Sequence, residues 1–306
     1  MKRRFALALG LLTGLPLLAG WVIARTMMHP RPRVEDHGLD DFDLPAEDVT
    51  FAGRDGTRLA GWFIPAREPG PRPGIVLSHG WARSRAELLP HADFLHRAGF
   101  GVLMFDYRHR GESDGDAITM AVREQDDLHG AIDTLAARPE VDGGRIGVLG
   151  MSMGGVVAIL VAAEAERVRA LWVEAPYGSF DALMTRALPH YSRLPAFPFA
   201  AVAKWHLERQ LDVSIDGHRP RDVIRSLSPR PLFVVADERD AVVGADETQR
   251  LFSVAAEPKQ LWLIPGADHA RGWQAAPEEY ERRAVAFFQE AFAGPVGAPV
   301  EETVRP

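Results

Sequence analysis

The amino-acid sequence predicts an α/β domain with a mostly parallel central sheet flanked by helices. Six short apolar runs recur along the chain, and each is continuous rather than alternating, as in strands that are buried on both faces of a parallel sheet. Helical patterns separate most of these runs, as crossover connections require. The six runs are Gly74–Leu77, Gly101–Phe105, Ile146–Leu149, Ala170–Val173, Leu232–Val235 and Leu261–Ile264.

Antiparallel strands are expected at the start of this domain. Apolar runs lie on both sides of Asp55-Gly56, and a D-G pair between such runs is typical of a β-hairpin. At the other end of the domain, an amphipathic helix is predicted to pack on the sheet. Its apolar residues on one side are Tyr280, Ala284, Phe287, Phe288 and Ala291.

The strand pattern is interrupted between Glu174 and Leu232, where proline-punctuated aromatic segments replace a buried strand. We expect a helical lid there, at about residues 177–228, inserted in a domain that covers residues 48–293. Residues 25–47 are rich in proline and charge and are predicted to be a linker. Residues 294–306 are predicted to form a disordered tail.

Composition limits the possible functions. The chain has 306 residues, of which 46% are hydrophobic and 25% are charged, so it can bury a large core. A formal net charge of −7 argues against nucleic acid as a partner. The absence of cysteine excludes disulfides, thiolate metal sites and a cysteine nucleophile.

The N-terminus has the pattern of a membrane segment. Lys2, Arg3 and Arg4 precede the uncharged run Phe5–Ala24, which is long enough to cross a bilayer as a helix. We predict that residues 1–24 are a retained membrane anchor and that the following domain is extracytoplasmic, because flanking positive charge favours the cytoplasmic side. The alternative is a signal peptide that is cleaved after Ala24, which would release a secreted protein.

The pattern G-x-S-x-G occurs twice, in GESDG at residues 111–115 and in GMSMG at residues 150–154. Charged residues and glycines surround Ser113, which predicts an exposed loop in which the serine makes local turn hydrogen bonds. Ser152 instead lies between a buried strand, GRIGVLG, and a helix of small residues. Strand, tight turn and helix form the context of a nucleophile elbow, so Ser152 is the predicted nucleophile.

A serine nucleophile needs a histidine to take its proton and an acid to orient that histidine. His269 lies in the loop after the last predicted strand and before the final helix. Asp237 and Asp240 both follow an earlier strand. Asp240 is preferred because the valines after it indicate a turn that re-enters the core, and Asp237 remains the alternative. The order serine, aspartate, histidine is the one expected for a nucleophile on this kind of elbow.

Taken together, these motifs resemble the α/β-hydrolase superfamily, and more narrowly its membrane-anchored, serine-aminopeptidase-like and BEM46-like members. The resemblance rests on LSHGWARSRAELL, GVLMFDYRHRGESDGD, GRIGVLGMSMGG, the DAVV turn and GADHA, and it extends from about residue 49 to residue 292. It implies that the backbone N–H groups of Trp81 and Met153 form an oxyanion hole. Asp237 departs from the resemblance, since relatives often have glycine there.

Three further expectations concern residues around these motifs. His79 is expected to be a structural hydrogen-bonding residue rather than a catalyst. Glu124 and Asp127 are expected to pair with Arg108 or Arg110 and so to brace the loop around Ser113.

The expected function is that of a serine hydrolase acting on an ester or amide through an acyl-enzyme. Neither a metal nor an organic cofactor is expected. The lid aromatics Tyr191, Phe197, Phe199 and Trp205 favour an acyl or aromatic substrate, and so a carboxylesterase over an aminopeptidase, which needs acidic residues for a free amine. An acyltransferase or thioesterase with the same triad and, from another class, a non-catalytic binding protein remain alternatives.

Overall fold

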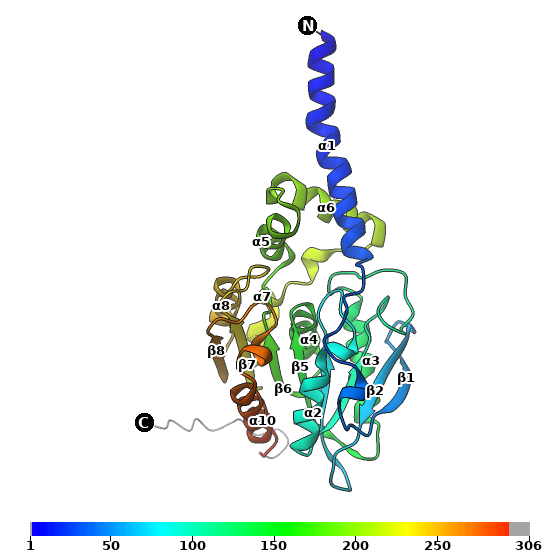
Figure 1. Ribbon diagram of the computed structural model, residues 1–306, viewed down its shortest axis with the longest axis vertical. Coiled ribbons are helices and arrows are strands. Elements are labelled where there is room, and N and C mark those ends of the chain that lie inside the picture. Colours follow the sequence, from blue (N-terminus) through cyan, green and yellow to red (C-terminus); the bar gives the residue numbers. More distant parts are fainter. Residues whose placement is uncertain (1, 294–306) are drawn as a thin grey trace.

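The computed structural model describes the backbone of residues 2–293 and the side chains of residues 14–293. Figure 1 shows a central sheet with helices on both sides, a group of helices at one end, and α1 (Lys2–Met28) projecting beyond that end. The predicted disordered tail, residues 294–306, lies outside the described residues.

The sheet has eight strands in the order β1-β2-β4-β3-β5-β6-β7-β8. The hairpin predicted around Asp55-Gly56 is confirmed, because β1 and β2 pair antiparallel, and β2 then pairs antiparallel with β4. The remaining neighbours are parallel, as predicted. The strands are β1 (Glu47–Ala52), β2 (Arg58–Ile64), β3 (Arg72–Ser78), β4 (Gly101–Phe105), β5 (Val141–Met151), β6 (Val168–Glu174), β7 (Leu232–Asp237) and β8 (Lys259–Ile264).

Each face of the sheet has its own apolar core. Alternate residues of a strand point to opposite faces, so Val76 packs in one core and its neighbours Ile75 and Leu77 pack in the other. The first core contains residues of α3 (Glu124–Ala136), α4 (Met153–Glu164) and α8 (Ala245–Val254). The second contains residues of α2 (Leu89–Arg97) and α10 (Pro277–Ala293).

The final helix packs on the sheet as the sequence predicted. The five residues expected on its apolar side are all buried in α10. Tyr280 also accepts a hydrogen bond from the indole N–H of Trp172 at 2.8 Å.

The prediction that every apolar run is buried on both faces is wrong for β8. Leu261 and Leu263 are 36% and 39% exposed. The reason is that β8 is the last strand of the sheet, with a neighbour on the β7 side alone.

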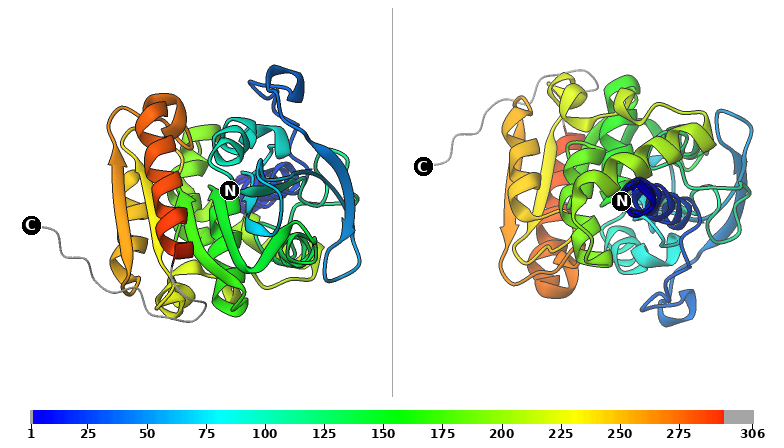
Figure 2. Two further views of the ribbon diagram at one scale, coloured as in Figure 1. Left: turned by 90° about the horizontal axis from the view of Figure 1, so that it is seen from below. Right: turned by 90° about the horizontal axis from the view of Figure 1, so that it is seen from above.

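Between β6 and β7 the chain forms α5 (Phe180–Ser192), α6 (Ala196–Leu211) and the short α7 (Pro220–Val223). The helix α6 packs against the second half of α1. A Cβ atom on Gly20 would lie 2.5 Å from the Val202 side chain, so glycine allows the two helices to approach closely. Figure 2, in the view from above, shows α1 nearly end-on beside α6.

Within the described part of the chain, no helix is both long and apolar enough to cross a lipid bilayer. The run Phe5–Ala24, predicted to be a membrane anchor, lies partly outside the residues whose side chains are described. The anchor therefore stays a prediction.

Candidate active site

Ser152 lies at a strained turn between β5 and α4. Its backbone has φ 50° and ψ −115°, a conformation that residues other than glycine rarely adopt. The space around the turn explains the flanking glycines. A Cβ atom on Gly154 would lie 2.1 Å from the Ser78 carbonyl oxygen, and one on Gly150 would lie 2.7 Å from the Gly154 carbonyl oxygen. The G-x-S-x-G pattern is therefore a packing requirement of this turn.

The structure brings Ser152, His269 and Asp240 together. The Nε2 atom of His269 lies 2.9 Å from the Ser152 Oγ atom, and its Nδ1 atom lies 2.8 Å from Asp240 Oδ2. Both distances are those of hydrogen bonds. The three residues follow β5, β7 and β8, and parallel strands present their carboxyl ends at the same edge of the sheet. This is the arrangement in which a histidine can take the serine proton.

Asp240 is held in the form that can orient a histidine. Its second oxygen, Oδ1, accepts the backbone N–H groups of Val242 at 2.8 Å and Val243 at 2.9 Å. Burial by itself would raise the pKa of Asp240. The hydrogen bond from His269, the charge of that side chain and the hydrogen bonds from the two amides together lower the pKa below its usual value. Asp240 is therefore ionised at neutral pH and accepts a hydrogen bond from the Nδ1–H group of His269.

Asp237, the alternative acid, contacts the histidine loop at a different point. Its Oδ2 atom accepts the backbone N–H of Ala270 at 2.8 Å. Burial, with the nearby carboxyl of Glu174, raises the pKa of Asp237 to about 10, so this side chain is a neutral acid at pH 7.

Glu174 is a second buried acid that supports the same loop. Its Oε1 atom accepts the backbone N–H of Gly272 at 2.8 Å, and burial raises its pKa. This role was not predicted from the sequence. The available signal was a carboxylate at the end of a continuous apolar strand, where a buried acid needs a polar partner.

The loop after β3 lies against the start of α4. Ser78 pairs in register with Gly150, and its hydroxyl donates to the Gly154 carbonyl at 2.9 Å. His79 bonds the Gly80 carbonyl through Nδ1 and accepts the Tyr107 N–H through Nε2. Burial lowers the pKa of His79 to about 4. It is therefore a neutral structural residue, as expected.

The two backbone amides predicted to form an oxyanion hole have no acceptor among the described residues. Met153 is the first residue of α4, so its N–H has no acceptor within the helix. In the described part of the chain, no hydrogen bond uses the N–H of Trp81. The Trp81 indole N–H donates to the Met27 carbonyl at the end of α1, at a distance of 3.0 Å.

The segment after α1 continues along the same loop, and this contact was not predicted from the sequence. The N–H of Arg33 donates to the Ala82 carbonyl at 3.1 Å. Glu35 accepts the Ser84 N–H at 2.8 Å and forms an ion pair with Arg83 at 3.0 Å. Residues 27–35 thus hold the loop that carries Trp81.

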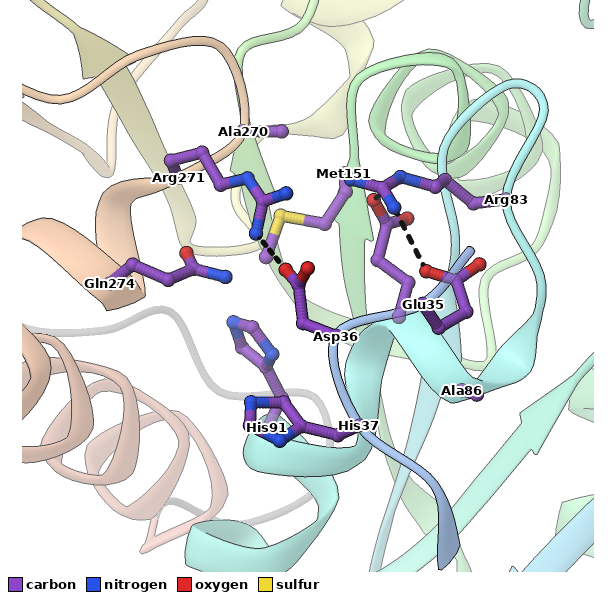
Figure 3. Close-up of a pocket in the computed structure, with 11 residues that line it drawn as sticks. Glu35, Asp36, His37, Arg83, Ala86, His91, Met151, Ala270, Arg271 and Gln274 are labelled. Atoms are coloured by element: carbon purple, nitrogen blue, oxygen red, sulfur yellow. Dashed lines mark hydrogen bonds and ion pairs between the residues drawn. The ribbon is translucent and has the colours of Figure 1, made fainter. Parts of the chain in front are cut away.

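A small cavity separates this segment from the histidine loop, as Figure 3 shows. Its volume of about 20 Å³ is enough for little more than one water molecule. Part of its wall is formed by Met151 and Ala270, which are the sequence neighbours of Ser152 and His269. Asp36 and Arg271 form an ion pair across the cavity.

Glu87, which also lines the cavity, is buried beside the loop that carries Trp81. It accepts the Gly80 N–H at 2.7 Å and pairs with Arg83 at 3.0 Å. Burial raises the pKa of Glu87 to about 7.

The second G-x-S-x-G motif has a structural role. The Ser113 hydroxyl donates to the Asp106 carbonyl at 2.6 Å and accepts the Ala60 N–H at 2.9 Å. Asp127 pairs with Arg108 at 2.6 Å, as predicted.

The predicted pairing of Glu124 with an arginine is wrong. Its carboxylate accepts the N–H groups of Thr119 and Ala121, in the turn that precedes α3, at 2.7 and 2.8 Å. Glu124 is buried, and these amides satisfy its carboxylate as a buried charge requires. Arg110 donates to backbone carbonyls instead, including that of Arg83 at 3.0 Å.

Within the described residues, no group of three or more His, Asp and Glu side chains is arranged to hold a metal ion.

Comparisons with known proteins give related families and folds. The family described as serine aminopeptidase, S33, matches residues 69–226. The uncharacterized protein YfhR of Escherichia coli O157:H7 is 32% identical over 230 residues, which is 73% of each chain. The polyketide transferase ATR5 of Stachybotrys chlorohalonatus is 26% identical over 271 residues, which is 74% of this chain and 90% of that one. The structure of the Pyrococcus furiosus esterase Pf2001 superposes with a TM-score of 0.71 at 27% identity, covering 86% of this chain and 97% of that one.

The raised pKa of Asp237 predicts how stability changes with pH. Between its ordinary value of 3.8 and the folded value of about 10, the folded chain holds a proton that the unfolded chain releases. The contribution of Asp237 to the free energy of unfolding is therefore fully present when the pH is below the ordinary pKa. It is lost as the pH rises toward the folded pKa. Asp237→Asn has no proton to lose, so its melting temperature should exceed that of the wild type by a margin that grows with pH.

The measurement is thermal unfolding of both proteins from about pH 5 to about pH 9. Asp222→Asn, at an exposed aspartate, is the matched control and should show no such growing margin. A margin for Asp237→Asn that is constant or shrinks with pH would contradict the neutral-acid assignment.

Proposed function

Because this chain belongs to the serine aminopeptidase S33 family and has an α/β-hydrolase fold, we propose that it is a serine hydrolase that cleaves an acyl bond through Ser152, His269 and Asp240. The observation that carries the proposal is the continuous hydrogen-bonded chain from Asp240 through His269 to Ser152. The strained backbone at Ser152 supports it, because strain of this kind is typical of a nucleophile elbow.

The reaction proceeds in two halves. The Ser152 Oγ atom attacks the carbonyl carbon of the substrate while His269 Nε2 takes its proton, and Asp240 stabilises the resulting imidazolium. His269 then gives that proton to the leaving group as the acyl-enzyme forms. In the second half, His269 activates a water molecule that releases the acid and restores Ser152.

The proposed oxyanion hole consists of the backbone N–H groups of Trp81 and Met153. The carbonyl oxygen becomes negative in the tetrahedral intermediate, and the loss of one such donor typically costs about 3 kcal/mol. The contacts of residues 27–35 with the loop around Trp81 would keep one of these donors in place.

An ester is the favoured substrate class. Recognition of a free amine by an aminopeptidase requires a carboxylate that is free to bind it. The acids beside the proposed site already have partners, because Glu35 and Glu87 pair with Arg83 and Asp36 pairs with Arg271. The structural similarity to the Pyrococcus furiosus esterase supports the same choice.

Acyl transfer is the second candidate activity. The similarity to a protein named polyketide transferase favours it, since a transferase would differ from a hydrolase in the acceptor that releases the acyl group. Product analysis of acyl-enzyme turnover with water alone and with added alcohols or thiols distinguishes the two.

The two G-x-S-x-G serines provide a direct test of the nucleophile. Ser152→Ala should lower the hydrolysis of short p-nitrophenyl esters by several orders of magnitude, because no other side chain can form the acyl-enzyme. Ser113→Ala is the matched control and should keep most of the activity, because Ser113 bonds backbone groups of Asp106 and Ala60.

Labelling with a fluorophosphonate should follow the same pattern, and failure of the wild type to react would favour a non-catalytic protein. An inactive Ser113 variant together with an active Ser152 variant would exclude the proposed nucleophile.

The two aspartates should differ sharply in their effect on turnover. Asp240→Asn replaces the charged partner of His269 and favours the wrong imidazole tautomer, which lowers kcat by about 10⁴-fold in a triad. Asp237→Asn keeps a neutral acceptor for the Ala270 amide, so kcat should stay within about tenfold of the wild type. Steady-state kinetics on a soluble ester measures both, and the reverse order would transfer the role to Asp237.

We further propose that the uncharged run Phe5–Ala24 keeps the protein on a membrane, with the hydrolase domain on the extracytoplasmic side. Lys2, Arg3 and Arg4 before the run support this orientation. The full-length chain should remain in the membrane pellet after salt and carbonate washing, and protease should reach the domain from the extracytoplasmic side alone. A soluble product that begins near Arg25 would indicate a cleaved signal peptide instead.

A further inference from the structure

The lid aromatics face outward rather than into the protein. Tyr191, Phe197 and Trp205 are 54%, 83% and 50% exposed, and Phe199 is the one of the four that is buried. Phe197, Ala201 and Trp205 are all exposed. Ala201 and Trp205 are four residues apart on α6 and share one face of it, and Phe197 lies just before them at a kink where the backbone leaves helical geometry. The lid therefore presents large apolar side chains to its surroundings.

The neighbouring helix α1 adds to this exposed apolar area. Gly20 and Ala24 on one side of α1 are buried, and Gly20 packs on α6, while Leu15, Leu18 and Trp21 are 60%, 62% and 42% exposed. We define the lid surface as Leu15, Leu18, Trp21, Tyr191, Phe197 and Trp205. These side chains lie on α1, α5 and α6, of which α6 packs on both of the others. Large exposed apolar side chains on neighbouring elements usually mark an interaction site.

Arginines accompany the tryptophans of the lid surface. The guanidinium carbons of Arg25 and Arg209 lie 5.9 Å from the ring centres of Trp21 and Trp205, respectively. Neither arginine, nor Arg193 at the end of α5, forms an ion pair with another described residue. Tryptophan beside an unpaired arginine matches the interface of a bilayer, where the ring lies at headgroup depth and the guanidinium meets a phosphate.

We propose that the lid surface rests on a lipid bilayer that contains anionic headgroups, and that the substrates are acyl esters dissolved in that bilayer. The substrate part of this inference rests on the proposed hydrolase function. In Figure 1, α5 and α6 lie at the end of the molecule from which α1 projects. Ser152 lies at the carboxyl ends of the parallel strands, on the same side as these helices, so an ester leaving the bilayer would enter near the site.

A second copy of the chain fits this surface less well than a bilayer. A symmetric contact through the lid surface would bring the arginines of the two copies together, and like charges repel most strongly when they are removed from water. Anionic lipid headgroups instead provide the opposite charge at the depth where these arginines lie.

The binding test measures the contact of one tryptophan with lipid and does not depend on catalysis. The full-length Ser152→Ala chain is bound to vesicles of phosphatidylcholine and phosphatidylglycerol in which the acyl chains carry bromine, which quenches nearby indoles. Replacement of Trp205 by phenylalanine should remove a clear part of the quenching. Trp262→Phe is the matched control and should leave the quenching unchanged, because Trp262 lies on β8 and packs on Tyr280 and Arg283.

The activity test compares one soluble ester with a long-chain ester carried in the same vesicles. Phe197→Ser combined with Trp205→Ser should keep the rate on the soluble ester within about twofold and lower the rate on the vesicle ester by about tenfold or more, because both rings leave the lipid. The matched control is Val254→Ser with Leu261→Ser, which removes two exposed apolar side chains outside the lid, one at the end of α8 and one on β8. This control should change neither rate.

Each result has a definite meaning. The proposed surface would be overturned if the quenching were unchanged in Trp205→Phe, or if the Phe197→Ser, Trp205→Ser variant lost both rates equally. It would also be overturned if the wild type formed concentration-dependent dimers that this variant did not form. If the wild type hydrolysed neither ester, the hydrolase function would fail, and the quenching experiment would still decide whether the lid touches lipid.

Discussion

The hydrogen bond between Ser152 and His269 is the contact on which the proposed site depends, and much of the fold is arranged around it. It joins the ends of β5 and β8, which are separated in the sheet by β6 and β7. The serine is fixed by the strained turn into α4, where glycines allow the backbone to pass the Ser78 carbonyl. A shift in the pairing of any of these four strands would move the two atoms apart.

Three acids hold the histidine and the loop that follows it. Asp240 is ionised and holds the imidazole, whereas Asp237 is neutral at pH 7 and holds the backbone amide after His269. Glu174 holds a second amide of the same loop, and its own carbonyl accepts the N–H of Ser152 at 2.8 Å. One residue at the end of β6 thus supports both the serine turn and the histidine loop, which couples their positions.

The N-terminal segment contributes to the site as well as to the proposed membrane contact. The Met27 carbonyl and the Glu35 carboxylate hold the loop that carries Trp81, and the preceding turns of α1 pack on α6. The segment predicted as a linker therefore links the lid helix to the loop that carries the proposed oxyanion amide.

The sequence by itself determined the parts of this protein that depend on local pattern. Continuous apolar runs predicted the parallel strands. The strand-turn-helix context distinguished Ser152 from Ser113, whose motif lies among charged residues and glycines. His269 was predicted from its place after the last strand, and Asp240 was preferred over Asp237 because the valines after it indicate a turn that re-enters the core. The exposure of β8 was missed because strand order across the sheet is set by long-range pairing.

Tertiary structure alone decided the contacts between distant segments. Three such contacts join residues that are far apart in sequence: Glu174 with Gly272, Trp81 with Met27, and Glu35 with Ser84. No local pattern specifies which acid or carbonyl accepts a hydrogen bond from which N–H group. The same holds for the lid aromatics, whose helical spacing fits either an inward or an outward face. Their direction was fixed by which side of α6 packs on α1 and on the core, and that depends on the complementary shapes of surfaces that the folded chain brings together.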